Sequence, residues 1–170
     1  MEEEKKEKTT RRNEMYNHSE LNNENIVLHD CYANSMNYEN GVLSFVFPEG
    51  FWVITQHIEN DSDKIVRTDL SKVDFKLLDG VVEDVQVYIF RKNERSDTIR
   101  EEWKLDDFIT KVNSGFFKVE FIDEYKTYQS NLYKCWVHFD NEPYHYECEI
   151  IIDTENVTYN WNQLRYECAW

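Results

Sequence analysis

Glycine and proline are scarce in this chain, which has four glycines and two prolines among 170 residues. So few glycines leave no Gly-rich loop that could cradle the phosphates of a nucleotide. No uninterrupted apolar run exceeds four residues, and the first residues are charged rather than apolar. The sequence therefore predicts neither a membrane-spanning segment nor a signal peptide, and it favours the cytoplasm.

Basic residues are also few, because 19 Lys and Arg stand against 34 Asp and Glu. The first 14 residues hold five of each sign, so residues 15–170 carry 29 acidic and 14 basic side chains and the whole net charge of -15. Such a surface repels phosphate backbones and anionic lipids. We expect no nucleic-acid or membrane partner, and we expect a basic protein as the partner.

Cysteine and metal-ligand motifs are sparse. The four cysteines form no CxxC pattern and are expected to be reduced thiols in the cytoplasm, with Cys135 to Cys148 as the one bridge favoured under oxidising conditions. His138 and His145 could hold a metal together with Glu147 or Glu149, but histidines are common on protein surfaces and no other residue has ligand spacing. We therefore predict no metal and no cofactor.

Length and composition predict one folded domain. Hydrophobic residues make up 41% and aromatic residues 15% of the chain, enough to form a core despite 31% charge. We expect a charged N-terminal arm over residues 1–25, with Glu-to-base pairs at i,i+4 spacing that allow a solvated helix. Residues 26–170 then form a single β-rich domain.

The segment from Leu132 to Ile152 predicts a β-hairpin whose register can be tested. Asp140-Asn141-Glu142-Pro143 favours a turn, which opposes every pair of residues whose numbers sum to 283. Cys135 then faces Cys148 on an apolar face. The polar face pairs Lys134 with Glu149, Trp136 with Glu147, and His138 with His145.

Two further hairpins are predicted from turn residues. Asn40-Gly41 favours a type I′ turn that pairs Tyr38 with Leu43 and Met36 with Phe45. Pro48-Glu49-Gly50 then turns the chain into a strand at 51–54, which continues a β-meander. A three-residue loop at 78–80 would place Val73 opposite Val85.

The remaining elements follow from periodicity. Leu105, Phe108, Ile109 and Val112 stand at i, i+3, i+4 and i+7 before Gly115, which predicts a helix. We expect strands at 26–32 and 157–161, a polar break at 123–130 and a tail at 165–170. The expected fold class is α+β and mainly antiparallel β: about eight strands in a meander sandwich or partly open barrel with one short helix.

One triplet raises the possibility of catalysis. His29-Asp30-Cys31 contains the residue types of a cysteine nucleophile with its base, and would support a hydrolase-type enzyme. On a strand, however, His29 and Cys31 are too far apart for a reliable hydrogen bond. A buried core thiol beside a hydrogen-bonded histidine is the favoured interpretation.

Tryptophan and tyrosine are abundant, with five and eleven copies, and both are favoured at protein interfaces. Trp136 falls on the polar face of the predicted hairpin, although a second layer could cover it. The loop Glu59 to Lys64 adds acidic residues. The candidate binding residues are Trp136, Glu147, Glu149, His138, His145, Asp61 and Asp63.

The chain resembles the small acidic immunity-type proteins of bacteria and uncharacterised β-rich bacterial domains. The resemblance rests on size, charge, aromatic content and segments such as Leu28-His29-Asp30-Cys31 and Pro48-Glu49-Gly50-Phe51-Trp52. It implies a protein-binding module for a basic partner and transfers no site residues. The alternatives are a carrier that binds a small apolar ligand inside a β-barrel, and an enzyme that uses His29 or Cys31.

Overall fold

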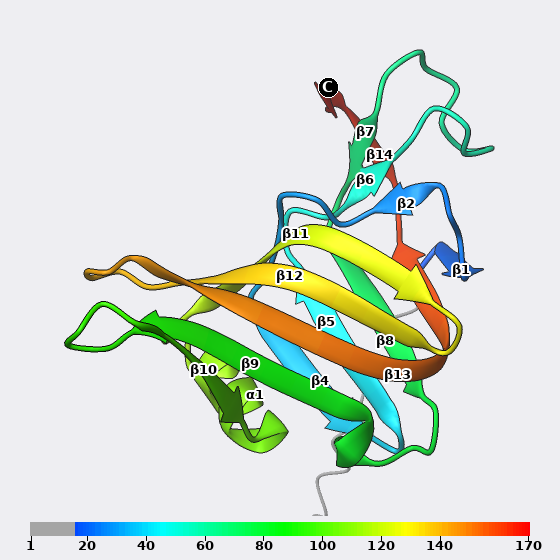
Figure 1. Ribbon diagram of the computed structural model, residues 1–170. Coiled ribbons are helices and arrows are strands. Elements are labelled where there is room, and N and C mark those ends of the chain that lie inside the picture. The colour runs from blue at the N-terminus through cyan, green and yellow to red at the C-terminus, as the bar shows by residue number, and fades with distance from the viewer. Residues whose placement is uncertain (1–15) are drawn as a thin grey trace, which may run out of the picture.

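The computed structural model describes residues 16–170 and confirms a mainly antiparallel β fold with one α-helix (Figure 1). The described residues form one sheet of ten strands and one of four. The helix α1 spans Leu105–Asn113 and a 3-10 turn, η1, spans Val82–Asp84. The strands are β1 (His18–Leu21), β2 (Ile26–Val27), β3 (Cys31–Ala33), β4 (Ser35–Glu39), β5 (Val42–Phe47), β6 (Trp52–Val53), β7 (Val66–Thr68), β8 (Ser71–Leu77), β9 (Val85–Lys92), β10 (Thr98–Trp103), β11 (Lys118–Thr127), β12 (Ser130–His138), β13 (His145–Trp161) and β14 (Leu164–Ala169).

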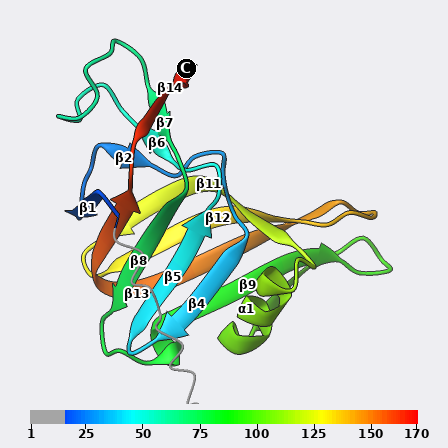
Figure 2. The same cartoon turned by 180° about the vertical axis from the view of Figure 1, so that it is seen from behind.

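The 17-residue strand β13 organises the large sheet. Its first part pairs with β9 and β12, and its second part pairs with β8 and β1. The register with β8 shifts between Thr154 and Asn156, and such a bulge bends a strand. The strands β4, β5 and β8 lie behind β9, β11 and β12 in Figure 1 and in front of them in the reverse view of Figure 2. The sheet thus folds into two facing layers, and because its end strands β3 and β4 do not pair, it does not close into a barrel.

Aromatic side chains from both layers fill the space between them. Phe45 of β5 lies edge-on to Phe121 of β11, with ring centroids 5.3 Å apart. Phe121 is also 5.3 Å from Tyr133 of β12, and Phe75 of β8 contacts both Phe45 and Tyr133. All four are buried, because alternate residues of each strand face inward. The centre of the fold is a packed core.

The helix α1 covers one end of the core, as its periodicity predicts. Leu105, Phe108 and Val112 are buried, and Gly115 follows the last turn with φ of 75°. The Asn113 amide donates to the Met36 carbonyl oxygen and its Oδ1 accepts from the Met36 amide, both at 2.8 Å. These two hydrogen bonds attach the helix to the strand β4.

The small sheet has the order β14-β7-β6-β2 and projects from the end of the body opposite α1 (Figure 1). The turn before β6 contacts β7 closely at Gly50, where a Cβ atom would lie 2.3 Å from the Thr68 carbonyl oxygen. Gly50 also has φ of 75°, which favours glycine. This turn therefore needs glycine for two independent reasons.

The register of two predicted hairpins is confirmed. Cys135 pairs with Cys148, Lys134 with Glu149 and His138 with His145. Around Asn40 and Gly41, which both have positive φ, Tyr38 pairs with Leu43 and Met36 with Phe45. Turn residues and period-two patterns therefore determined these pairings locally.

The expected meander is wrong beyond β5. β5 pairs with β8, whereas β6 belongs to the small sheet. The predicted pairing of Val73 with Val85 is also wrong, because Val73 faces Phe45 and Tyr159 while Val85 faces Ile152. Both β8 and β9 lie along the same edge of β13, which is long enough to pair with the two in succession.

Several expected boundaries are also wrong. The strand expected at 26–32 divides into β2 and β3, with Asp30 at φ of 56° between them. The stretch at 123–130, expected as a polar break, continues the pairing of β11 with β12 and contains the short turn between them. The segment 157–161 is the end of β13 and not a separate strand. The expected tail at 165–170 is largely the strand β14. Polar side chains on the solvent face of these strands made their sequence resemble loops.

The helix expected from the Glu-to-base pairs lies in residues 1–15, outside the described residues. Within the rest of the expected arm, β1 pairs with β13 over His18 to Leu21. The His18 ring stacks on Trp161 with centroids 3.9 Å apart. This segment is therefore part of the large sheet.

Candidate functional site

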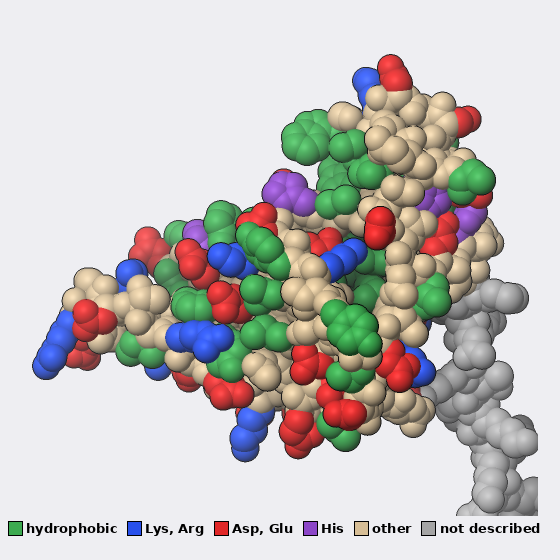
Figure 3. Space-filling view, turned by 45° about the vertical axis from the view of Figure 1, so that its right-hand side comes forward, with side chains coloured by type: hydrophobic (Ala, Val, Ile, Leu, Met, Phe, Trp, Pro, Cys, Tyr) green, Lys and Arg blue, Asp and Glu red, His purple; other side chains and the backbone are tan. Residues whose placement is uncertain are grey.

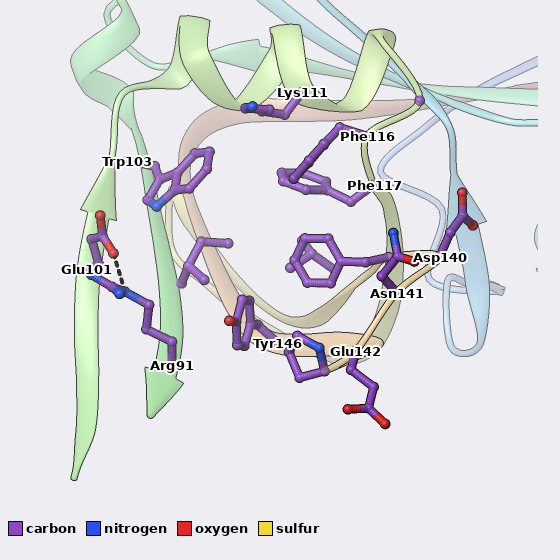
Figure 4. A pocket seen from close by; sticks show the side chains of 15 residues that line it. Arg91, Glu101, Trp103, Lys111, Phe116, Phe117, Asp140, Asn141, Glu142 and Tyr146 are labelled. Carbon is purple, nitrogen blue, oxygen red and sulfur yellow. Dashed lines mark hydrogen bonds and ion pairs between the residues drawn. The ribbon is translucent and has the colours of Figure 1, made fainter. Parts of the chain in front are cut away.

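A pocket of about 600 Å³ opens at the end of the two layers where the β9–β10 hairpin, the β12–β13 turn and α1 meet (Figure 4). Its volume lies within the range of about 300–1,000 Å³ that is usual for small-ligand sites. The packed core separates it from the small sheet. The interior of the fold is therefore filled, and the cavity lies at its end.

The pocket wall is largely aromatic. Phe117 of the segment after α1 lies 5.8 Å from Phe139, which in turn lies 5.2 Å from Tyr146, all measured between ring centroids. Phe116 is 53% exposed and packs 5.7 Å from Phe139 at the opening. The remaining apolar lining residues are Ile89, Trp103, Val137 and Pro143.

Local rules position four of the residues that line the pocket. Val137 and Ile89 lie on the inward-facing side of β12 and β9, where alternate residues face the core. Gly115 ends the helix with positive φ and turns the chain so that Phe116 and Phe117 reach the pocket (Figure 4). Strands and the helix thus hold part of the wall, and the connecting segments 115–117 and 139–143 complete it.

Polar groups surround the opening. Arg91 Nε lies 2.7 Å from Glu101 Oε2 across the β9–β10 hairpin. The Lys111 ammonium lies 4.2 Å from the centroid of the Phe116 ring, a cation–π contact. The Trp103 indole N–H is buried and has no hydrogen-bond acceptor among the described residues. The site combines an apolar wall with a charged entrance.

Five of the residues named from the sequence lie together elsewhere, on the outer face of β12 and β13. Trp136 is 38% exposed and stacks on the His145 ring at 4.6 Å. The His138 ring lies 5.9 Å from that of His145. Glu147 pairs with Trp136 in the strand register, and Glu149 with Lys134. The predicted register thus placed all five on one face.

Two of these residues have polar partners that the sequence did not reveal. His138 Nε2 lies 2.6 Å from an Oε2 of Glu120, a buried carboxylate of β11. Glu149 lies 3.6 Å from Arg100 of β10, whose guanidinium covers the Tyr88 ring. Trp136 and Glu147 are the more available members of this face.

Asp61 and Asp63 lie in the loop between β6 and β7, far from the β12–β13 turn (Figure 1). The Tyr166 hydroxyl donates to Asp61 Oδ1 at 2.8 Å, and the same acceptor raises the Tyr166 pKa. The structure does not bring these two carboxylates to the outer face of β12 and β13.

His29 and Cys31 do not form a nucleophile and base pair. The His29 Nδ1–H donates to the Ile122 carbonyl oxygen at 2.6 Å, and the Cys31 thiol donates to the backbone carbonyl oxygen of His29 at 3.4 Å. Burial raises the pKa of Cys31 to about 11. A thiol with that pKa stays protonated at neutral pH, whereas a cysteine nucleophile needs its thiolate.

Among residues 16–170, no group of three or more His, Cys, Asp and Glu side chains is arranged to hold a metal ion. No helix in the same range combines the length and apolar character needed to cross a bilayer. Comparisons of the chain with family models, curated proteins and solved structures found no match.

The residues of the pocket were missed from the sequence. The strands β9, β10, β12 and β13, the helix α1 and two connecting segments contribute to it, and no short motif joins them. The available indication was the group of large aromatics at the helix end and the hairpin turn, Phe116, Phe117 and Phe139. Their spacing in sequence gives no sign that they meet.

Proposed function

We propose that the protein binds a small, largely apolar ligand in the pocket under α1. The observation that carries the proposal is the 600 Å³ cavity with its mostly apolar, aromatic wall. Enclosing an apolar group there removes its surface and that of the wall from water, which favours binding by about 25 cal/mol per Å². The strands and the helix α1 hold part of the wall, which limits the conformational entropy lost on binding.

The test is titration with the neutral fluorescent probe N-phenyl-1-naphthylamine. We expect saturable binding to the native protein that changes little between about 0.05 and 0.5 M NaCl, because salt screens charges and not apolar contacts. The variant Phe116→Ala removes an exposed part of the wall and should weaken binding by about 1–2 kcal/mol, or roughly tenfold.

The matched control is Tyr128→Ala, which removes an 89% exposed aromatic residue from the turn between β11 and β12. That variant should bind the probe as the native protein does. Equal probe binding by native protein and Phe116→Ala, or no saturable binding at all, would contradict the proposal.

A second candidate is binding of a basic protein, as immunity-type modules do. It is favoured by the exposed Trp136, stacked on His145 and adjacent to Glu147, in a protein with a net charge of -15. Figure 3 shows acidic side chains spread over one face of the molecule. An aromatic anchor with surrounding carboxylates is suited to a lysine- or arginine-rich surface.

Capture of basic proteins on immobilised native protein tests this candidate. A specific partner should be retained at low salt, released as salt rises, and lost with Glu147→Lys. The control Glu83→Lys makes the same charge change at an exposed residue of η1 and should keep the partner. Equal retention by both variants would rule out this face as the binding surface.

A further inference from the structure

Two arginines lie directly opposite each other in the small sheet. Arg67 of β7 pairs with Arg165 of β14 in the strand register, and on its other side Arg67 pairs with Trp52 of β6. Directly opposite residues of antiparallel strands point to the same face of a sheet. Like charges in that position repel and disfavour the folded chain. This row of Arg67 and Arg165 is unusual in a protein with a net charge of -15.

The hydrogen bonds of Arg67 leave its charge without a counterion among residues 16–170. Its Nη2 donates to the Asp30 carbonyl oxygen at 2.9 Å and to Cys31 Sγ at 3.5 Å. Its Nε is buried with no acceptor, and no carboxylate lies within ion-pair distance among the described residues. The guanidinium lies 4.5 Å from the centroid of the Trp52 ring. Its Nη1 donates to no group in residues 16–170.

Arg165 is only partly neutralised. Its Nε donates to the Thr68 carbonyl oxygen at 3.1 Å, and its Nη2 donates to the backbone oxygen and Oε2 of Glu49 at 3.1 and 3.3 Å. Within the described part of the chain, its Nη1 has no acceptor either. Each guanidinium therefore keeps one terminal nitrogen for another oxyanion.

Both arginines line a pocket of about 330 Å³ that is separate from the one under α1. Trp52 and Trp170 also line it, with ring centroids 6.1 Å apart. Two side-chain carboxylates line the pocket: Glu49 accepts from Arg165, and Asp30 Oδ2 lies 3.3 Å from His29 Nε2. The site presents two guanidiniums beside two indole rings.

We propose that Arg67 and Arg165 bind the carboxylate of an aromatic acid whose ring packs against Trp52 and Trp170. A guanidinium fork matches the two oxygens of a carboxylate, and indole faces favour planar rings. The acid is either a free small molecule or the aromatic C-terminal residue of a peptide, since both present the same chemistry.

Calorimetric titration with matched probes tests the site. Benzoate should bind at least tenfold more tightly than benzamide, which lacks the charge, and than acetate, which lacks the ring. N-acetylphenylalanine represents a peptide C-terminus, and its affinity relative to benzoate distinguishes the two sources. Arg165→Gln should weaken benzoate binding at least tenfold. Arg95→Gln, on the β9–β10 turn, should leave it unchanged.

A second measurement uses the protein's own thiols. Cys168 lines this pocket and is partly exposed, whereas Cys31, Cys135 and Cys148 are buried. Benzoate should slow the alkylation of Cys168 by iodoacetamide in the native protein, and benzamide should not. Equal binding of benzoate and benzamide, no protection of Cys168, or native-like binding by folded Arg165→Gln would overturn the proposal.

Discussion

At the scale of single residues, the fold gives chemically identical side chains different properties. Burial raises the pKa of Cys31 to about 11 and raises the pKa values of Cys135 and Cys148 well above that of a free thiol. Cys168 is only partly buried. Three of the four thiols are therefore core side chains, and one is accessible to reagents.

The raised thiol pKa values predict alkaline destabilisation. Above about pH 9 the unfolded chain loses thiol protons that the folded chain retains, so the free energy of unfolding should fall by about 1.4 kcal/mol per pH unit for each such group. This stability is fully present below that pH. Urea unfolding at pH 7 to 10 measures it. The stability lost in Cys148→Ala relative to the native protein should shrink as pH rises; a loss that stays the same from pH 7 to 10 would contradict this.

Two glycines with the same φ of 75° predict different costs of substitution. In Gly50→Ala the new Cβ would lie 2.3 Å from Thr68 atoms, whereas in Gly115→Ala it meets nothing within 4 Å. Gly115→Ala should therefore lower the free energy of unfolding by about 1 kcal/mol, through backbone strain alone. Gly50→Ala should lower it by about 3 kcal/mol or more. Chemical denaturation compares the two, and equal losses would show that the close approach to β7 is unimportant.

At the scale of elements, the bulge of β13 is where one strand changes partners. Thr154 Oγ donates to the Lys76 carbonyl oxygen at 2.6 Å and lies 2.8 Å from that of Asn156. Its single hydroxyl hydrogen thereby serves backbone carbonyl oxygens at the register shift. The hydroxyl stabilises the bend that lets β13 belong to both layers.

Thr154→Val keeps the shape of the side chain and removes this hydroxyl. The variant should lose about 1–2 kcal/mol of unfolding free energy, because buried carbonyl groups lose their donor. Thr158→Val, in the same strand, is the control, because the Thr158 hydroxyl makes no hydrogen bond to the described residues. This variant should lose under about 0.5 kcal/mol of unfolding free energy. Similar losses in both would assign the cost to the strand in general.

At the scale of the whole molecule, the dominant property is charge. A net charge of -15 on a folded body of this size repels itself and opposes compaction. The ion pairs within it are mostly exposed, as between Lys76 and Glu155 or Arg91 and Glu101, and such pairs add little stability. The repulsion should therefore outweigh them at low ionic strength.

Salt should stabilise the protein as a result. Raising NaCl from about 0.02 to 0.3 M shortens the Debye length to below about 10 Å, so the melting temperature should rise by several degrees. Choline chloride at the same concentration should have the same effect, because the effect is screening and not cation binding. A melting temperature that stays constant or falls would mean that the exposed ion pairs outweigh the repulsion.

Local sequence patterns were enough to predict several elements. The register of Cys135 with Cys148 followed from a turn and a period of two, the Asn40-Gly41 hairpin from two residues that tolerate positive φ, and α1 from its apolar spacing. The register of Cys135 with Cys148 also predicted that Trp136 and Glu147 lie on the outer face. Each depends on residues within one hairpin or one helix.

The pairing of distant strands and the position of the pocket could be seen only in the folded chain. The partners of β8 and β9 depended on the length and bend of β13, some 70 residues away in the chain. The pocket under α1 and the row of Arg67 and Arg165 arise where segments from different parts of the chain meet. Local patterns specify which face of a strand is buried, but the choice among many apolar partners is made by packing the whole chain at once.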